Sequence, residues 1–516
     1  MTSILQILVL CSGSIVLYGL GLVVYRLFLH PLSRFPGPKF TAATQWYEAY
    51  YDLVKYPGGQ FIYEIDRMHR VYGPIVRITP NEIHVKDSSW EKVLYTSYSK
   101  GVRNKYPPAA AMVGLPNDVF GTIDQEHHHR RRTAINAYFS RKSVEQAEPI
   151  LHGFLDIFCK KIQDRLENNG YIKMNVIALA LTADTSSKYA FGKDLGLLED
   201  DNKALNWYKT NKALATMIPT VRQFPWCMPL SLKIPVELIR ILSAEFARVL
   251  DLRHMYTPPQ AGPRQDKNIK SAELGSEKNV WTSILSSKLP PEEKEALRMA
   301  DEAFTLIAAG GEGTGRAICI GLFYVLSDKS SIMPPLMEEL LSVMPEKSSK
   351  PSMRALEKLP LLTGIVKETL RIAGLLATRL PLIDPHEALR YGEWCIPPGT
   401  PVSMSQRDVF LDPTIFPDPN KFDPTRWLPS NPELQHLNQH FYPFGRGDRM
   451  CVGWHLAMTE IYMILATIIR RFDLELHDTI RERDIDIVRD SFLGEPSLES
   501  KGVRVRLATT LPNTDS

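Results

Sequence analysis

The sequence predicts a mainly helical fold with a small β component, preceded by one transmembrane helix. Residues 143–190 and 290–327 carry apolar side chains in long helical patterns. Residues 71–87 alternate and are rich in valine and isoleucine, which predicts one small β-hairpin. Residues 4–25 form an apolar run of the length that crosses a bilayer. Together these patterns indicate a membrane-anchored, mainly α protein.

Composition and charge narrow the class of protein further. The 516 residues are 44% hydrophobic and 23% charged, which is ordinary for a globular protein and excludes a disordered or fibrous main body. The 61 basic and 58 acidic residues give a net charge of +3, so no nucleic-acid partner is expected. The six cysteines lie far apart without a CxxC motif, which argues against a zinc ribbon and a dense disulfide framework. We expect free thiols in a reducing compartment.

The N-terminal run is predicted to be a retained membrane anchor. No charged residue precedes Arg26, and as a helix the run spans about 33 Å, against a hydrocarbon core of about 30 Å. The alternative, a cleaved signal peptide, requires a basic start and a small-residue cleavage site, and the sequence has neither. Basic residues follow the run and the first acid is Glu48, so the positive-inside rule places the rest of the chain in the cytosol.

Behind the anchor, the sequence predicts a short hinge and one large domain. Residues 1–29 are assigned to the anchor, and residues 30–39, which hold three prolines, to a stiff hinge. Residues 40–516 are assigned to a single catalytic domain without internal repeats. Within it, the polar residues 257–278 are expected to form a surface loop, with a domain linker as the alternative. Residues 405–450 show little periodicity, which predicts an ordered coil.

The strongest chemical signal is the segment Phe444-Gly-Arg-Gly-Asp-Arg-Met-Cys451-Val-Gly453. Its glycines permit positive φ and a close approach of the backbone to a flat ligand. Cys451 precedes a predicted helix that runs to about Phe472, and the helix dipole is expected to lower the pKa of its thiol. A thiolate there suits an axial ligand of haem iron, and Arg449 suits a propionate. The alternative is a structural cysteine in a glycine-rich turn.

This segment resembles the cysteine-ligand loop of the cytochrome P450 family, F-x-x-G-x-R-x-C-x-G, and Leu456-Ala-Met-Thr-Glu460 continues the family pattern. The resemblance covers nearly the whole chain and implies the cytochrome P450 fold. It implies haem b with Cys451 as the iron ligand and with Phe444 and Arg449 at the cofactor. It further implies dioxygen as a co-substrate and electrons from NADPH through cytochrome P450 reductase.

Two further motifs resemble a structural charge triad of the family. Glu368-Thr-Leu-Arg371 resembles E-x-x-R, and Phe422-Asp-Pro-Thr-Arg426-Trp427 resembles F-x-P-x-R-W. The resemblance implies that Arg426 joins Glu368 and Arg371 and fixes the coil that holds the cysteine loop. Most of the other E-x-x-R spacings in the chain are expected to be surface pairs on helices. A buried triad is costly to break, and we expect a structural role for it rather than a catalytic one.

A histidine triplet is followed by an arginine triplet at residues 127–132. Three adjacent side chains on a helix point in three directions, so a shared metal ion is not expected. His128 and Arg132 resemble the H-x-x-x-R that fungal family members carry on one helix. One helical turn apart, both are expected to reach a haem propionate.

The segment Ala309-Gly-Gly-Glu-Gly-Thr314 interrupts the long pattern at 290–327 with glycines. It resembles the family pattern A-G-x-[D/E]-T-[T/S], which implies that Gly310 opens a groove for dioxygen and that Glu312 and Thr314 are catalytic and guide protons. Gly313 stands where the family usually has threonine, which puts the usual relay in doubt. The alternative is that these glycines only let the helix pack or bend.

A second departure follows at Arg379-Leu-Pro-Leu382, where fungal members commonly read R-x-P-R. The missing second arginine often contacts a propionate, and whether Arg379 replaces it is open at this point. Several N-terminal motifs, among them Trp46–Asp52 and His69–Arg77, resemble fungal members similar to trichodiene oxygenase. Residues 106–119 are apolar and small, and by analogy they suit the roof of a pocket for an apolar substrate.

The expected function is a haem-thiolate monooxygenase that inserts an oxygen atom from O2 into an apolar small molecule, such as a fungal terpenoid or polyketide-like secondary metabolite. We expect a single-pass protein of the endoplasmic reticulum membrane with a cytosolic catalytic domain. Arg130–Arg132 and Arg446 are candidates for contacts with an acidic reductase surface. Two alternatives remain: a haem-thiolate isomerase or dehydratase that needs no reductase, motivated by Gly313, and a non-catalytic haem-binding protein.

Overall fold

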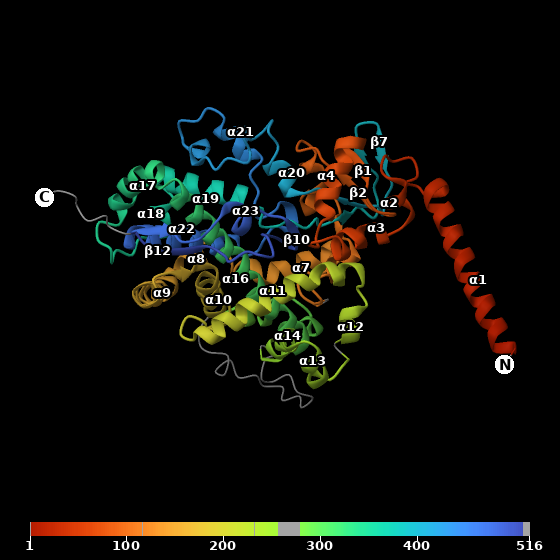
Figure 1. The fold of residues 1–516 in the computed structure, drawn as a ribbon, viewed down its shortest axis with the longest axis horizontal. Coiled ribbons are helices and arrows are strands. Elements are labelled where there is room, and N and C mark those ends of the chain that lie inside the picture. The colour runs from red at the N-terminus through yellow and green to blue at the C-terminus, as the bar shows by residue number, and fades with distance from the viewer. Residues whose placement is uncertain (1, 116, 232, 256–278, 509–516) are drawn as a thin grey trace.

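The computed structural model describes residues 2–115, 117–231, 233–255 and 279–508. Its N-terminal helix α1 (Thr2–Val24), continued by η1 (Tyr25–Leu29), extends away from a helical body (Figure 1). Among the described residues, one helix, Gln6–Leu29, is long and apolar enough to cross a membrane, and its side chains are exposed. The surface loop expected at 257–278 lies outside the described residues.

The body is built around the helix α16 (Ala296–Ser327), which runs through its middle (Figure 1). It packs against α10 (Met174–Phe191), α19 (Pro360–Ile372) and α22 (Trp454–Arg471) in the main hydrophobic core. Helix α16 approaches α10 closely at Gly315, which has no side chain. A Cβ at this position would lie 3.0 Å from the backbone nitrogen of Leu179. The predicted mainly helical class is confirmed.

The other described helices surround this core. They are α2 (Lys39–Ala43), α3 (Trp46–Ala49), α4 (Phe61–Tyr72), α5 (Glu91–Leu94), α6 (Pro107–Ala111), α7 (Gln125–Asn136), α8 (Arg141–Gln146), α9 (Glu148–Asn169), α11 (Asp201–Gln223), α12 (Cys227–Ser231), α13 (Val236–Leu242), α14 (Ala244–Met255), α15 (Val280–Leu285), α17 (Lys329–Val343), α18 (Met353–Leu356), α20 (Gln406–Phe410), α21 (Leu434–Gln439) and α23 (Arg481–Asp484).

The β structure consists of small sheets. A five-stranded sheet has the order β1 (Ile75–Arg77), β2 (Ile83–Val85), β8 (Pro401–Ser403), β5 (Leu382–Ile383) and β3 (Asn104–Lys105), in which β2 and β8 are parallel. The hairpin predicted at 71–87 is β1–β2, with Val76 opposite His84. The smaller sheets contain β4 (Ile172–Lys173), β12 (Arg504–Leu507) and β9 (Leu474–Leu476), then β10 (Arg489–Ser491) and β11 (Leu493–Glu495), and β6 (Leu389–Tyr391) and β7 (Trp394–Ile396).

The segment between anchor and body is docked on the first sheet. The backbone N–H of Arg77 donates to Pro36 O at 2.7 Å, and its guanidinium donates to Arg26 O at 2.9 Å. Leu32 is buried in the small core beneath this segment. The proline-rich segment therefore joins α1 to the body as a fixed connection.

The charge triad expected from two distant motifs forms at α19. Arg371 donates to both oxygens of Glu368, at 2.7 and 2.8 Å, and Arg426 of η5 (Pro424–Trp427) donates to Glu368 at 3.3 Å. Trp427 adds a hydrogen bond from its indole N–H to the same carboxylate at 3.0 Å. All four side chains are buried. This cluster fixes the irregular coil that leads to the cysteine segment.

Candidate active site

The cysteine segment folds as a tight loop before α22. Gly445 and Gly447 have φ of +80° and +70°, a region that other residues rarely adopt, and a Cβ at Gly447 would lie 2.5 Å from Thr96 O. The backbone N–H of Cys451 donates to Phe444 O at 2.9 Å and closes the loop. Cys451 therefore stands three residues before the first residue of α22, Trp454. The loop therefore bends at its glycines and presents one thiol, as the sequence predicts.

The Cys451 side chain is accessible, although protein surrounds the loop. Burial raises the pKa of this thiol above its ordinary value, and the Gly453 N–H and Arg132 oppose that rise. The Gly453 N–H at the start of α22 acts in the predicted direction, but burial outweighs it in the protein alone. A cation bound at the sulfur reverses this balance, since a coordinating thiol is deprotonated.

Three predicted cofactor residues gather beside this thiol. Arg449 donates to Thr122 O and Ile123 O, each at 2.7 Å, and its buried Nε has no hydrogen-bond partner. His128 is buried, with Nδ1 unpartnered, and burial together with Arg449 lowers its pKa to about 2. Arg132 lies near enough to Cys451 for their charges to interact.

Lys105 joins this group and was missed by sequence reasoning. It is buried on β3, donates to Phe120 O and lies over the Phe120 ring. Burial and Arg449 hold its pKa well below the ordinary value. A single lysine in a short strand carries no motif, so only the fold reveals it.

The four basic side chains, called the basic cradle below, are Lys105, His128, Arg132 and Arg449, of which the first two are buried and the two arginines are partly accessible. Within the described residues, none of them forms an ion pair with a carboxylate. Buried cationic groups and unpartnered N–H groups are costly unless an anion compensates them. A haem carries two propionates, and their negative charges would compensate these groups next to the accessible thiol. These residues therefore fit a haem.

The predicted groove residues on α16 divide between two faces. A Cβ at Gly310 would lie 2.5 Å from Ser186 Oγ, so Gly310 faces α10 and not an open side. Ala309 is exposed in the middle of this otherwise buried helix, and a Cβ at Gly313 would meet no atom within 4 Å. The open face of α16 is therefore made by Ala309 and Gly313, one turn apart, and not by Gly310 as expected.

Glu312 is bound in an ion-pair network that the sequence did not reveal. Lys212 of α11 donates to Glu312 at 2.9 Å and to Glu495 of β11 at 2.8 Å, and Arg316 lies 3.2 Å from Glu495. Burial opposes the charge of Lys212, yet the two carboxylates raise its pKa above the ordinary value. Thr314 is buried, and two residues along a helix it does not face the Glu312 carboxylate.

Arg379 is not part of the basic cradle. It donates to Glu82 at 2.8 Å and to Glu48 at 2.6 Å, and all three side chains are buried. Arg222, at the end of α11, binds Asp52 in the same cluster. Arg379 thus joins the N-terminal segment to the first sheet, while its buried Nη1 has no hydrogen-bond partner among the described residues.

The arginines considered for a reductase contact are mostly engaged inside the protein. Arg131 is buried and donates to Glu293 at 2.7 Å. Arg446 pairs with Glu91 at 2.7 Å, and Arg132 belongs to the basic cradle. Arg130 is exposed. Of the arginines considered for a reductase contact, Arg130 is therefore the one that is exposed at the surface.

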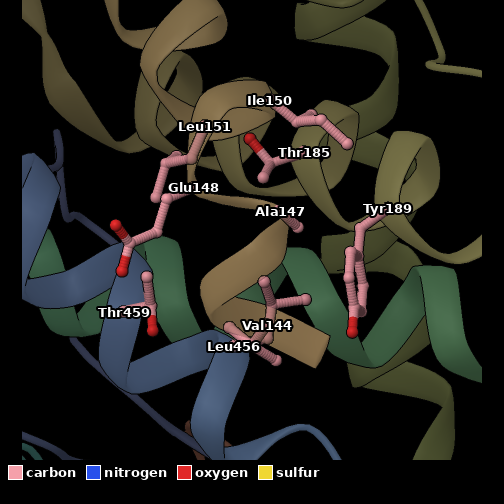
Figure 2. A pocket seen from close by; sticks show the side chains of 9 residues that line it. All are labelled: Val144, Ala147, Glu148, Ile150, Leu151, Thr185, Tyr189, Leu456 and Thr459. Carbon is pink, nitrogen blue, oxygen red and sulfur yellow. The ribbon is translucent and has the colours of Figure 1, made fainter. Parts of the chain in front are cut away.

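A small cavity lies elsewhere in the body, among α8, α9, α10 and α22. Figure 2 shows the nine side chains that line it, which include Glu148, Thr185, Tyr189 and Thr459. It contains neither the cysteine loop nor any residue of the basic cradle or of the open face of α16. This cavity is therefore separate from the candidate active site.

A helical body that presents one accessible thiol from a glycine-bent loop, beside basic side chains that have no carboxylate partner among the described residues, is the arrangement of a haem-thiolate enzyme. The cytochrome P450 family model matches residues 44–498. The chain is 37% identical to tryptophan 6-hydroxylase fscE of Fusarium equiseti, over 95% of each chain. It is 36% identical to cytochrome P450 monooxygenase sdnE of Sordaria araneosa, over 98% of each, and 34% identical to conidiogenone synthase PchP450 of Penicillium rubens, over 95% of this chain and 96% of that protein.

The chain belongs to the cytochrome P450 family. It is a monooxygenase that oxygenates small molecules in fungal secondary metabolism. The family implies a haem-thiolate centre and electrons supplied by a redox partner. The resemblance to trichodiene oxygenase stays a resemblance.

Two glycines of α16 are expected to respond oppositely to alanine. Gly313→Ala places its methyl group in open space and gains helix propensity, so it should stabilise the fold by about 0.5–1 kcal/mol. Gly315→Ala meets the Leu179 backbone at 3.0–3.1 Å and should destabilise it by about 1–3 kcal/mol. Thermal unfolding of both variants measures the difference. Equal shifts would contradict the assignment of open and packed faces.

Proposed function

We propose that the chain is a membrane-anchored haem-thiolate monooxygenase that takes electrons from NADPH through cytochrome P450 reductase. Its substrate is an apolar small molecule of fungal specialised metabolism, terpenoid or polyketide-like in skeleton. The observation that carries the proposal is the accessible Cys451 thiol beside four basic side chains, of which Lys105 and His128 are buried and none pairs with a carboxylate among the described residues.

In this proposal, Cys451 would hold the iron of haem b, and the basic cradle would bind its two propionates. When bound, haem b supplies the activation of dioxygen and the transfer of one oxygen atom. The Phe444 carbonyl holds the Cys451 backbone, which fixes the direction of the thiol. The cradle holds its donors in place before binding, because Arg449 is fixed by two carbonyl groups.

Protons reach the open face of α16 through side chains of this chain. Lys212 Nζ donates to Glu312 Oε1, and the Lys212 side chain is partly accessible, so it links Glu312 to the outside. Glu312 then changes partner and carries a proton toward Ala309 and Gly313. Gly313 has no hydroxyl, so a water in its open space takes the position of the usual threonine, with Thr314 behind it.

The decisive test measures turnover of the full-length, haem-loaded protein with and without NADPH and reductase. The proposal predicts that product formation requires both and that one oxygen atom of the product comes from O2. Turnover that persists without NADPH and reductase would instead assign the isomerase or dehydratase function. Haem binding without any turnover or ligand-induced spectral shift would indicate a non-catalytic haem-binding protein.

The membrane association proposed here, in the endoplasmic reticulum with a cytosolic body, involves more than α1. Large apolar side chains are exposed on the N-terminal segment and on the helices after α11, and the ring of Trp46 lies 5.9 Å from that of Phe224 between them. This apolar patch consists of Phe40, Trp46, Tyr50, Val54, Tyr56, Trp226, Leu230, Leu238 and Ile241. Figure 1 shows α3 and α12 on the side from which α1 extends.

Deletion of residues 1–29 is therefore expected to leave part of the protein on membranes. Each large apolar side chain that enters the lipid contributes about 1.5–3 kcal/mol, and the patch offers several. Sedimentation with liposomes measures the bound fraction, and Trp46→Ser with Trp226→Ser in the shortened chain should release it. A shortened chain that is fully soluble before these substitutions would contradict the role of the patch.

A further inference from the structure

We propose that Thr305, supported by Asp118, recognises a hydrogen-bond donor on the substrate, an N–H or O–H group. The inference rests on the proposed function, because it concerns the same open face of α16. It adds a property of the substrate: a largely apolar molecule with one donor placed at a defined distance from the position that reacts.

Thr305 lies in line with the open positions of α16. Thr305, Ala309 and Gly313 follow one another at intervals of four residues, so they share one face of the helix. Thr305 is partly accessible, Ala309 is exposed and Gly313 borders open space. At 1.5 Å per residue, Thr305 lies about 6 Å before Ala309 and about 12 Å before Gly313. A substrate along this face reaches both the reacting end and Thr305.

The Thr305 hydroxyl is oriented by a buried carboxylate. Its Oγ1 donates to Asp118 Oδ2, while Asp118 Oδ1 accepts from the Gly121 N–H. The Asp118 side chain is fully buried, at 0% exposure, and it forms no ion pair with any of the described residues. A hydroxyl has one proton and two acceptor sites. Because the proton points to Asp118, the acceptor sites of Thr305 remain for a donor from the substrate.

The carboxylates of Asp118 and Glu302 behind Thr305 favour a donor over an anion, although Arg131 donates to the backbone oxygen of Asp118 at 3.3 Å. Glu302 is buried nearby, pairs with Arg298 at 2.8 Å and accepts from the Val119 N–H at 3.1 Å. Burial and then Glu302 raise the pKa of Asp118 to about 7, while Thr305, Gly121 and the charge of Lys105 oppose the rise. The ionised form of Asp118 holds Thr305 as an acceptor, so donor binding should strengthen as pH rises through about 7.

If Asp118 had a purely structural role, the expected ligand preferences would be different. The contact between Asp118 and Gly121 closes a turn in the loop and does not involve Thr305. If Asp118 served only this turn, removal of the Thr305 hydroxyl would change no ligand preference. Thr305→Val removes the hydroxyl and keeps the shape of the side chain, so it separates the two roles.

The experiment measures ligand affinity in the full-length, haem-loaded protein from the change in Soret absorption. Two matched pairs of probes differ in the donor alone: indole with 1-methylindole, and 2-naphthol with 2-methoxynaphthalene. We expect the wild-type protein to bind the donor member of at least one pair about 5–10-fold more tightly. A preference confined to the first pair identifies an N–H substrate, and one confined to the second an O–H substrate.

Thr305→Val should remove this preference and its dependence on pH, whereas Thr414→Val should keep both. Thr414 is a matched control because its hydroxyl also donates to an aspartate, Asp412 at 2.6 Å, but on the surface. Asp118→Asn keeps an acceptor for Gly121 and presents an amide donor to Thr305, which turns the hydroxyl proton outward. It should abolish the preference for the donor member of each pair, because the hydroxyl then presents its proton to the substrate.

Equal affinity within both pairs in the wild-type protein, or an unchanged preference in Thr305→Val, would overturn the inference. Either result is distinct from failure of the proposed function, which would show as turnover without NADPH or as absence of a thiolate-ligated haem. If Asp118→Asn does not fold, Thr305→Val still decides, because its substitution is isosteric.

Discussion

Cys451→Ser is expected to lose the long-wavelength Soret band of the reduced carbon-monoxide complex, together with turnover. The band reports a thiolate opposite the bound gas, and serine offers no thiolate. The thiolate also supplies the electron density that favours O–O cleavage, so we expect turnover to fall by more than about 1,000-fold. The substitution removes one sulfur from a loop whose shape depends on glycines and on a backbone hydrogen bond, so the fold should persist.

The measurement is a reduced carbon-monoxide difference spectrum on membranes that contain equal amounts of each protein. Cys395→Ser is the matched control, because Cys395 is also an accessible free thiol but lies on β7. It should leave the band unchanged. A normal band in Cys451→Ser, or its loss in Cys395→Ser, would show that another residue ligates the iron.

The features that sequence predicted well are those that act within a short segment. The anchor, the hairpin at β1–β2 and the loop of Cys451 depend on apolar runs, alternation and glycines next to one another. His128 and Arg132 were predicted from their resemblance to H-x-x-x-R, and both lie on α7, one helical turn apart. For these residues, local geometry determines the direction of the side chain.

The features that sequence missed depend on partners from distant segments. Lys105 enters the basic cradle from a strand, and Lys212 reaches Glu312 across 100 positions of the chain. Arg379 looked available for a propionate, but two carboxylates from the N-terminal segment hold it. No periodicity shows which charges meet when the chain folds.

Gly310 illustrates a different limit. The glycine-rich segment of α16 correctly marked a special part of the helix, yet a pattern does not show which face packs on a neighbour. Ser186 of α10 occupies the side of Gly310, so the open side falls at Ala309 and Gly313. Gly313, where the sequence departs from the family pattern, thus lies on the open face of the helix, where the proposed function requires protons. For the proton path, Gly313 is therefore a more informative position than Gly310.

Arg371→Met is expected to prevent stable folding and with it haem incorporation. The side chain is 0% exposed, and it donates to Glu368 twice and to the carbonyl groups of Phe410 and Pro419 at 2.8 Å each. Methionine fills much of the volume but removes two of the hydrogen bonds to the buried Glu368 carboxylate, which keeps those from Arg426 and Trp427, and it leaves the two carbonyl groups without this donor. Breaking a buried ion pair from one side costs about 3–5 kcal/mol. That is a large part of a total stability of about 5–15 kcal/mol.

The Glu64/Arg67 pair has the same three-residue spacing on α4 and provides the control. The Arg67 side chain is 48% exposed, and the buried Glu64 carboxylate keeps the hydrogen bond from the Tyr47 hydroxyl when Arg67→Met is made. A pair with one exposed partner loses less than a fully buried one, so this variant should be destabilised less than Arg371→Met. Thermal unfolding and haem content measure both. Similar stability of the two variants would show that burial of the triad does not fix the coil leading to Cys451, and the structural role argued for Glu368, Arg371 and Arg426 would be wrong.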